Sequence, residues 1–158
     1  MQLIIIKTHK LLIKHKNTVA VAESCTAGLL SYLLTQLPGS SRYFLLGITT
    51  YSNTSKGKLL RIPASVIASH GAVSKVVAVR MSESIKHIAH ADFGIAITGI
   101  AGPTGGSPGK PVGTVYIAVA SRDNTLCKRF IFNGSRFRIR NQAALKALEM
   151  LVALIPHN

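Results

Sequence analysis

The hydrophobic and polar positions of the chain fall into short apolar runs separated by longer amphipathic segments. Runs rich in β-branched and aromatic residues predict five strands, at residues 18–22, 43–51, 93–98, 114–121 and 126–132. Helical spacing predicts a first helix ending near residues 16–17 and further helices at 29–37, after 52–56, from about 63, at 75–90 and at 141–155. Strands alternating with helices are typical of an α/β protein. We therefore expect a three-layer α/β/α sandwich with a mostly parallel, mixed five-stranded sheet, whose last two strands form an antiparallel pair across residues 122–124.

Composition limits the class of protein further. The 158 residues are one domain's worth of chain, and we expect a single domain over residues 1–158. Hydrophobic residues make up 47% and charged residues only 15%, which indicates a well-filled core rather than disorder. Two cysteines, Cys25 and Cys127, are too few for a disulfide framework and suggest a reducing, cytoplasmic setting. No apolar run approaches the ~20 residues that span a bilayer, so we expect no membrane association.

The charge is strongly positive, with 19 Lys+Arg against 5 Asp+Glu and a net charge of +14. Such a balance suits a phosphate-bearing small molecule or a nucleic acid, although a generally basic surface is the plainer interpretation. Basic residues cluster near the start (Lys7, Lys10, Lys14, Lys16) and near the end (Arg136, Arg138, Arg140). Only the second cluster adjoins Gly and Ser residues. If that segment is extended, its three arginines project to one side and either grip a phosphate or carboxylate or remain solvated on an edge strand.

Residues 22–28 (AESCTAG) join the first predicted strand to the second predicted helix. The first turn of a helix has unpaired amides and a positive dipole end, which would support a nucleophile or a phosphate at this point. Ser24 is one candidate nucleophile, but a serine needs a base. Cys25 is its rival because a helix N-terminus lowers the pKa of a thiol, although a buried, inert cysteine is the commoner case.

A base for Ser24 is available after the second predicted strand, in residues 51–56 (YSNTSK). If the first two strands are parallel, Lys56 lies near the same sheet edge as Ser24, and it could serve as the base provided that desolvation and neighbouring cations lower its pKa. Tyr51 offers a hydroxyl that could relay a proton. The alternative is a capped helix start with a solvated lysine. His87 and His90, with His70 upstream, lack the full ligand set of a metal site and are interpreted as exposed helix histidines.

A glycine-rich loop follows the third predicted strand, at residues 99–106 (GIAGPTGG). It matches neither the Walker A motif, because Pro111 follows Lys110, nor the G-x-G-x-x-G pattern. Glycines let a ligand approach the backbone closely, and the carboxyl ends of strands are where open α/β sheets bind ligands. These features favour a binding site over a purely structural loop.

Taken together and in this order, the motifs resemble the CinA C-terminal domain family, some of whose members occur alone as nicotinamide-nucleotide amidases. The segments that carry the resemblance are 22–28 (AESCTAG), 38–41 (PGSS), 51–53 (YSN) with Lys56, 70–74 (HGAVS), 98–106 (TGIAGPTGG), 110–115 (KPVGTV), Arg136 and Arg140. The resemblance implies hydrolysis of the carboxamide of nicotinamide mononucleotide to nicotinate mononucleotide and ammonia, without a metal or cofactor. It also implies a mixed sheet between helices and a homodimer.

Carried onto this sequence, the resemblance makes Ser24 the nucleophile, Lys56 the base and Tyr51 an assisting hydroxyl. The residues that it implies for substrate binding are Cys25, Thr26, Gly28, Ser52, Asn53, Thr98, Gly99, Gly102, Pro103, Gly105, Arg136 and Arg140, the two arginines taking the phosphate. Ala27 stands where the family usually has glycine, and Ser135 where it usually has an acidic residue. Two other functions stay open: a non-enzymatic competence or DNA-damage accessory that binds nucleic acid or protein, and a nucleotide-binding module without turnover. With Phe137 as the one aromatic among the arginines, we do not expect nucleic acid as the main partner.

Overall fold

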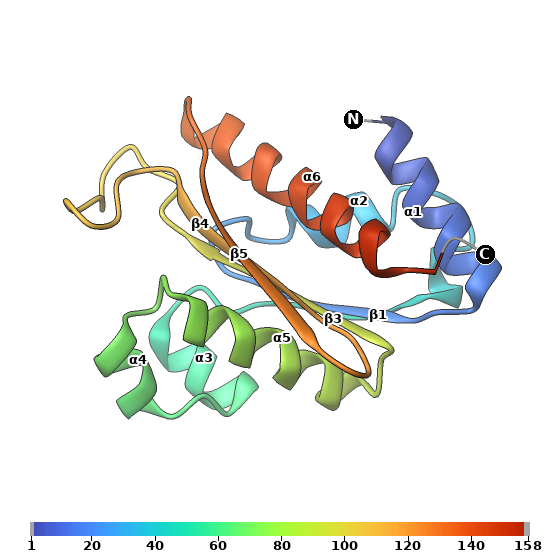
Figure 1. The fold of residues 1–158 in the computed structure, drawn as a ribbon, viewed down its shortest axis with the longest axis horizontal. Helices are drawn as coiled ribbons and strands as arrows, with labels where there is room; N and C mark the ends of the chain where they lie inside the picture. The colour runs from blue at the N-terminus through green and yellow to red at the C-terminus, as the bar shows by residue number, and fades with distance from the viewer. Residues whose placement is uncertain (1, 157–158) are drawn as a thin grey trace.

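A five-stranded sheet with helices on both faces forms the centre of the molecule in the computed structural model, which describes residues 2–156 (Figure 1). The sheet order is β2-β1-β3-β4-β5, with β1 Val19–Glu23, β2 Phe44–Thr49, β3 Phe93–Gly99, β4 Thr114–Ala120 and β5 Thr125–Ile131. Strand β1 pairs in parallel with β2 and with β3, whereas β3–β4 and β4–β5 are antiparallel. The mixed sheet is confirmed, with two antiparallel pairs instead of the one expected. A strand can pair in parallel with the preceding strand only if a crossover connection, usually a helix, carries the chain back to the same end of the sheet. The segment between β3 and β4 contains no helix, so β4 pairs with β3 in the antiparallel direction.

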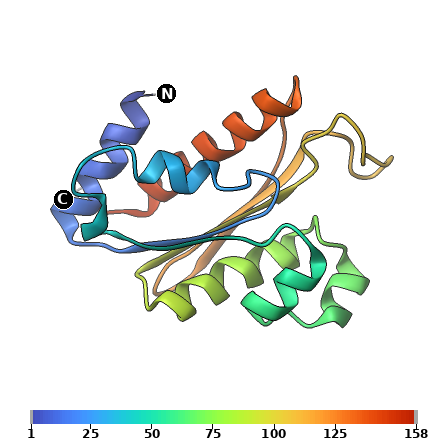
Figure 2. The same cartoon turned by 180° about the vertical axis from the view of Figure 1, so that it is seen from behind.

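The helices form two layers, one on each face of the sheet (Figures 1 and 2). Helices α1 (Gln2–His15), α2 (Leu29–Leu34) and α6 (Arg136–Leu154) cover one face, and α3 (Asn53–Leu60), α4 (Ala64–His70) and α5 (Lys75–Ala89) cover the other. A short 3-10 turn, Ser40–Arg42, precedes β2. The three-layer α/β/α arrangement expected from the sequence is confirmed. None of the described helices is long and apolar enough to cross a membrane.

Helix α6 starts earlier than the sequence pattern predicts. It begins at Arg136 instead of 141, because the Ser135 side chain caps its first turn by accepting a hydrogen bond from the backbone amide of Arg138. The arginine cluster is therefore helical, so the extended segment from which all three arginines would project to one side does not form. Residues four apart share one face of a helix, so Arg136 and Arg140 lie together while Arg138 points elsewhere.

The central strands are buried on both faces, which explains their nearly continuous apolar sequence. All five residues of β1 are buried, as are the first six of β3. One apolar cluster fills the space between the sheet and α1, α2 and α6, and includes Leu12, Leu30 and Leu148. A second, including Leu60, Met81 and Ile85, lies under α3, α4 and α5. The ends of β1, β2 and β3 are left to carry polar residues at one edge.

Helix α5 packs directly on β3 at Gly94, and this contact generates a stability prediction. A Cβ added to Gly94 would clash with the carbonyl oxygen of Ser82 and lie 2.9 Å from the amide nitrogen of Lys86. Because both atoms belong to the helix backbone, we expect Gly94→Ala to lower the free energy of unfolding by about 1–3 kcal/mol. Chemical denaturation measures this change.

The matched control for this substitution is Gly109→Ala in the exposed loop, where an added Cβ meets no atom within 4 Å. It should leave the free energy of unfolding nearly unchanged. Equal unfolding midpoints for the two variants would contradict the close packing of α5 on β3.

Candidate active site

Ser24 and Lys56 meet at the carboxyl edge of the sheet, with Lys56 Nζ lying 3.1 Å from Ser24 Oγ. Ser24 follows the last residue of β1, and its backbone amide donates to the carbonyl oxygen of Ile97 on β3 at 2.9 Å. Lys56 lies on α3, just beyond the end of β2. The parallel pairing of β1 with β2 and β3 therefore brings together two side chains that are 32 residues apart.

The Lys56 amine is held in a buried position that suits a base. The side chain is 1% exposed, and its Nζ donates to the carbonyl oxygen of Thr50 at 2.7 Å and to that of Tyr51 at 3.4 Å. Burial lowers the pKa of the Lys56 amine from its ordinary value of 10.5. A neutral amine has two hydrogens for the two carbonyl oxygens and one lone pair, which is left for the Ser24 hydroxyl.

The helix that carries Lys56 is fixed by its N-terminal cap. The Ser52 side chain accepts a hydrogen bond from the backbone amide of Ser55 at 3.0 Å. Ser52 is one of the residues expected to bind substrate, and the structure gives its hydroxyl this capping contact. The alternative interpretation of residues 51–56 was a capped helix start with a solvated lysine. The cap is present. The solvated lysine is wrong, because Lys56 is buried.

Cys25 is placed poorly for nucleophilic chemistry. The side chain is 5% exposed, and burial raises the pKa of its thiol to about 11, with the charge of Glu23 adding to the rise. The expectation that a helix N-terminus lowers this pKa is wrong, because α2 begins only at Leu29 and its first turn is already occupied. The thiol is protonated near neutral pH, so Ser24 is the better nucleophile.

The occupant of that first turn is the Glu23 carboxylate, a residue that the sequence reasoning missed. Glu23 is fully buried and accepts hydrogen bonds from the backbone amides of Gly28, Leu30 and Ser31 and from the Ser31 hydroxyl, at 2.7–3.1 Å. Gly28, expected to bind substrate, thus gives its amide to Glu23. A signal was present in the sequence: one acidic residue ends an otherwise apolar strand in a chain with five acidic residues.

Two arginines of α6 form hydrogen bonds with the turn after β1 and with the glycine-rich loop after β3. Arg140 donates to the carbonyl oxygen of Thr26 at 2.7 Å, and Arg136 donates to that of Gly102 at 2.9 Å. A second nitrogen of Arg136 donates to the Tyr51 hydroxyl at 2.7 Å. The structure thus brings Arg136, Arg140 and Tyr51 to the site, and it pairs the Tyr51 hydroxyl with Arg136. The expected relay from this hydroxyl to Lys56 forms no hydrogen bond among the described residues.

The glycine-rich loop between β3 and β4 extends beyond the sheet at the end of the molecule where α6 begins (Figure 1). At its base, Thr98 donates its hydroxyl to the carbonyl oxygen of Ala72 at 2.8 Å, and Gly99 packs against Val115 so closely that a Cβ would clash. Gly102 takes a positive φ of 75°. Farther along, Pro103 and Gly105 are exposed. The buried base of this loop and its exposed tip therefore offer different surfaces to a ligand.

Buried polar groups without partners also lie at this edge. The hydroxyls of Thr26 and Thr50 and the Nε of Arg140 have no hydrogen bond among the described residues. Buried polar atoms are nearly always hydrogen-bonded, so these groups are available to a polar ligand. Metal chemistry has no comparable support: no cluster of three His, Cys, Asp or Glu side chains occurs within residues 2–156.

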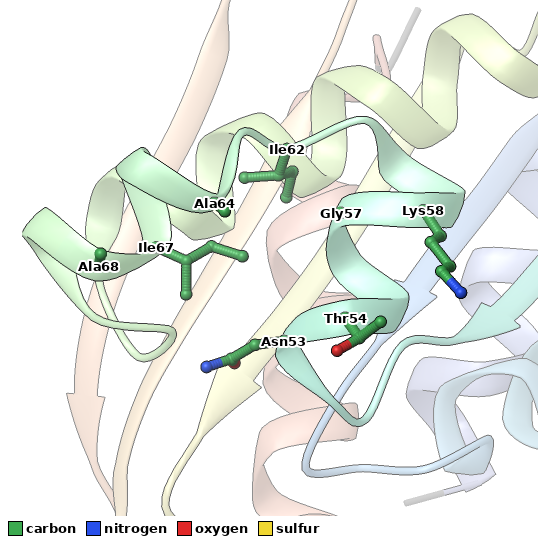
Figure 3. A pocket seen from close by; sticks show the side chains of 8 residues that line it. All are labelled: Asn53, Thr54, Gly57, Lys58, Ile62, Ala64, Ile67 and Ala68. Atoms are coloured by element: carbon green, nitrogen blue, oxygen red, sulfur yellow. The ribbon is translucent and has the colours of Figure 1, made fainter.

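Asn53, another residue expected to bind substrate, faces a separate groove of about 570 Å³ between α3 and α4 (Figure 3). Figure 3 shows its side chain pointing toward the side of the groove formed by Ile67. The groove is lined by Asn53, Thr54, Gly57, Lys58, Ile62, Ala64, Ile67 and Ala68. Neither Ser24 nor Lys56 lines it. Asn53 therefore lines a groove that the Ser24–Lys56 pair does not.

Comparison with known proteins identifies the family. Residues 3–155 match the CinA C-terminal domain. A CinA-like protein of Syntrophus aciditrophicus is 48% identical over 147 residues, covering 90% of this chain and 35% of that protein. A CinA-like protein of Geobacter sulfurreducens is 48% identical over 134 residues, covering 85% of this chain and 32% of that protein. The chain spans about a third of the length of these curated relatives.

Solved structures agree with the sequence matches. The competence damage-inducible protein A of Klebsiella pneumoniae superposes with a TM-score of 0.93 at 34% identity, covering 98% of this chain and 96% of that one. The competence/damage inducible protein CihA of Agrobacterium tumefaciens superposes with a TM-score of 0.91 at 36% identity, covering 96% and 94%. Sequence and structure lead to the same conclusion: the chain belongs to the CinA C-terminal domain family.

Proposed function

We propose that this chain is a nicotinamide-nucleotide amidase, which hydrolyses nicotinamide mononucleotide to nicotinate mononucleotide and ammonia. The observation that carries the proposal is the buried Lys56 amine, 3.1 Å from the Ser24 hydroxyl and with a lowered pKa. A serine beside a desolvated amine is equipped for nucleophilic attack on an amide carbonyl. Membership of the CinA C-terminal domain family supports this choice of reaction, because amide hydrolysis is what the resemblance to that family implies.

The reaction proceeds through an acyl-enzyme. Ser24 Oγ attacks the carboxamide carbon while Lys56 Nζ accepts the hydroxyl proton. Lys56 returns that proton to the amide nitrogen, the carbon–nitrogen bond breaks, and ammonia leaves. Water then attacks the ester carbonyl and gives a proton to Lys56, which protonates Ser24 Oγ as the nicotinate product departs.

The developing oxyanion needs hydrogen-bond donors beside Ser24. The backbone hydrogen bonds of the turn use the amides of Ser24 and Ala27, which donate to Ile97 and Ser24 carbonyl oxygens. This leaves the amides of Cys25 and Thr26 outside the turn's backbone bonding. We assign the oxyanion to these two amides, so stabilisation comes from the turn itself and not from the N-terminus of α2.

The phosphate of the substrate is assigned to Arg136 and Arg140. Both lie on one face of α6, and their guanidinium groups already reach the two loops that flank Ser24. An arginine has five N–H donors, so donors remain for phosphate oxygens after the contacts with Gly102, Tyr51 and Thr26. The net charge of +14 would steer an anionic nucleotide toward the protein.

Ammonia release from nicotinamide mononucleotide tests the proposal. We expect the wild-type chain to release ammonia and Ser24→Ala to lower kcat at least about a thousandfold, because the nucleophile is lost. Lys56→Met should lower kcat by about 10²–10⁴-fold through loss of the base. A coupled assay for ammonia measures all three rates.

Lys58→Met is the matched control, since Lys58 is an exposed lysine two positions along the same helix. It should keep wild-type activity. Absence of ammonia release by the wild type, or full activity in Ser24→Ala, would refute the proposed amidase.

The pH dependence of kcat/KM should follow the proton on Lys56. Only the neutral amine accepts the serine proton, so activity rises with pH as Lys56 deprotonates. Because burial lowers the pKa of Lys56, the midpoint of this rise should fall below 10.5. A profile measured between about pH 6 and pH 10 checks this, and a flat profile across that range would argue against a lysine base.

Cys25→Ala separates the serine mechanism from a thiol mechanism. The Cys25 thiol has a pKa of about 11 and remains protonated near neutral pH, so the substitution should leave kcat within about threefold of wild type. Loss of most activity, in a variant whose circular dichroism matches wild type, would make Cys25 a participant.

A further inference from the structure

The Glu23 carboxylate makes a fully satisfied, fully buried set of contacts next to the proposed nucleophile. One oxygen accepts from the backbone amide and the hydroxyl of Ser31, and the other accepts from the amides of Gly28 and Leu30. The side chain is 0% exposed. Four donors and the positive end of α2 stabilise the negative charge at this position.

These contacts close a loop around Ser24. Glu23 precedes Ser24 in the chain, and its hydrogen bonds reach five to eight residues forward, past the turn that holds Ser24, Cys25 and Thr26. The turn has a further constraint at Ala27, whose backbone has a φ of 49°. A left-handed conformation is unfavourable for a non-glycine residue, so the surrounding contacts must hold it in place.

We propose that Glu23 is a positioning residue for the Ser24 nucleophile. It fixes the two ends of the turn, so that Ser24 Oγ faces Lys56 Nζ and the amides of Cys25 and Thr26 face a substrate. It also occupies the N-terminus of α2, which directs the anionic part of a substrate toward the α6 arginines. This inference rests on the proposed function only in taking Ser24 as the nucleophile.

The substitution Glu23→Gln tests the hydrogen bonds with little change in volume. A side-chain amide has one acceptor oxygen, and its NH₂ group cannot accept from a backbone amide. In either orientation at least one backbone donor of the α2 N-terminus loses its partner. Ser31→Ala is the milder variant, because it removes the hydroxyl donor and keeps the three backbone donors.

The experiment measures the reactivity of Ser24 directly, with a small fluorophosphonate whose adduct is located by mass spectrometry. For Glu23→Gln we expect the labelling rate and kcat to fall by about tenfold or more, since a small misplacement of a reacting group is costly. KM should stay within about twofold, because the arginines are untouched. The midpoint of the pH profile should stay below 10.5, because Lys56 remains buried against the carbonyl oxygens of Thr50 and Tyr51. Ser31→Ala should give a smaller decrease in both rates.

Glu83→Gln is the matched control, since Glu83 is an exposed glutamate whose carboxylate accepts from the Thr125 hydroxyl. It should label at the wild-type rate. All rates are measured at 25 °C on variants whose circular dichroism matches wild type. If Glu23→Gln does not fold, Ser31→Ala decides the question.

A folded Glu23→Gln variant that labels at the wild-type rate would overturn the positioning role and leave Glu23 a structural cap. If only Ser31→Ala folds, labelling of that variant at the wild-type rate would overturn the positioning role. Failure of the proposed function gives a different pattern. A wild type that labels at Ser24 but releases no ammonia from nicotinamide mononucleotide overturns the substrate and leaves the positioning test intact. A wild type that does not label at Ser24 overturns both.

Discussion

The rest of the site depends on the burial of one lysine amine against one serine hydroxyl. Lys56 has almost no exposure to water, and desolvation of a charged amine is costly unless its proton can be given up. Two carbonyl oxygens just after β2 accept hydrogen bonds from Lys56 Nζ, and the Ser24 hydroxyl is the third group in contact with this nitrogen. This geometry requires parallel pairing of β1 and β2, because only then do the turn after β1 and the helix after β2 lie at one edge.

At this edge of the sheet, the N-terminus of α2 binds a buried carboxylate, whereas α6 provides positively charged side chains. Helix α2 would normally present a positive N-terminus to the site, but the buried Glu23 carboxylate uses its first amides. Helix α6 instead supplies two permanent cations, Arg136 and Arg140, one helical turn apart. Ser24 therefore lies between the carboxylate that fills the start of α2 and the two arginines of α6. That arrangement is what the proposed substrate needs, since it carries a neutral carboxamide at one end and a phosphate at the other.

Helix boundaries explain where the sequence predictions were inaccurate. The pattern after residue 141 is strongly amphipathic, but the first turn of α6 is polar and exposed, and its helical state depends on the Ser135 cap. Helix α2 begins at Leu29 as expected, after a tight turn between Ser24 and Gly28 with left-handed backbone at Ala27 and Gly28, but it ends at Leu34 instead of residue 37. Ala27 takes there a conformation that glycine adopts more easily.

The sequence by itself determined the α/β/α class, the order of strands and helices, and the candidate pair Ser24 and Lys56, because apolar periodicity and strand-end placement are local properties. Only the tertiary structure decided that Lys56 is buried, that burial raises the pKa of the Cys25 thiol, that Tyr51 pairs with Arg136, and that the Glu23 carboxylate fills the N-terminus of α2. Each of these depends on the solvent exposure of a group or on a hydrogen-bond partner brought by folding. Desolvation and hydrogen bonding set which polar side chains are reactive, and both exist only once the sheet has brought its strand ends together.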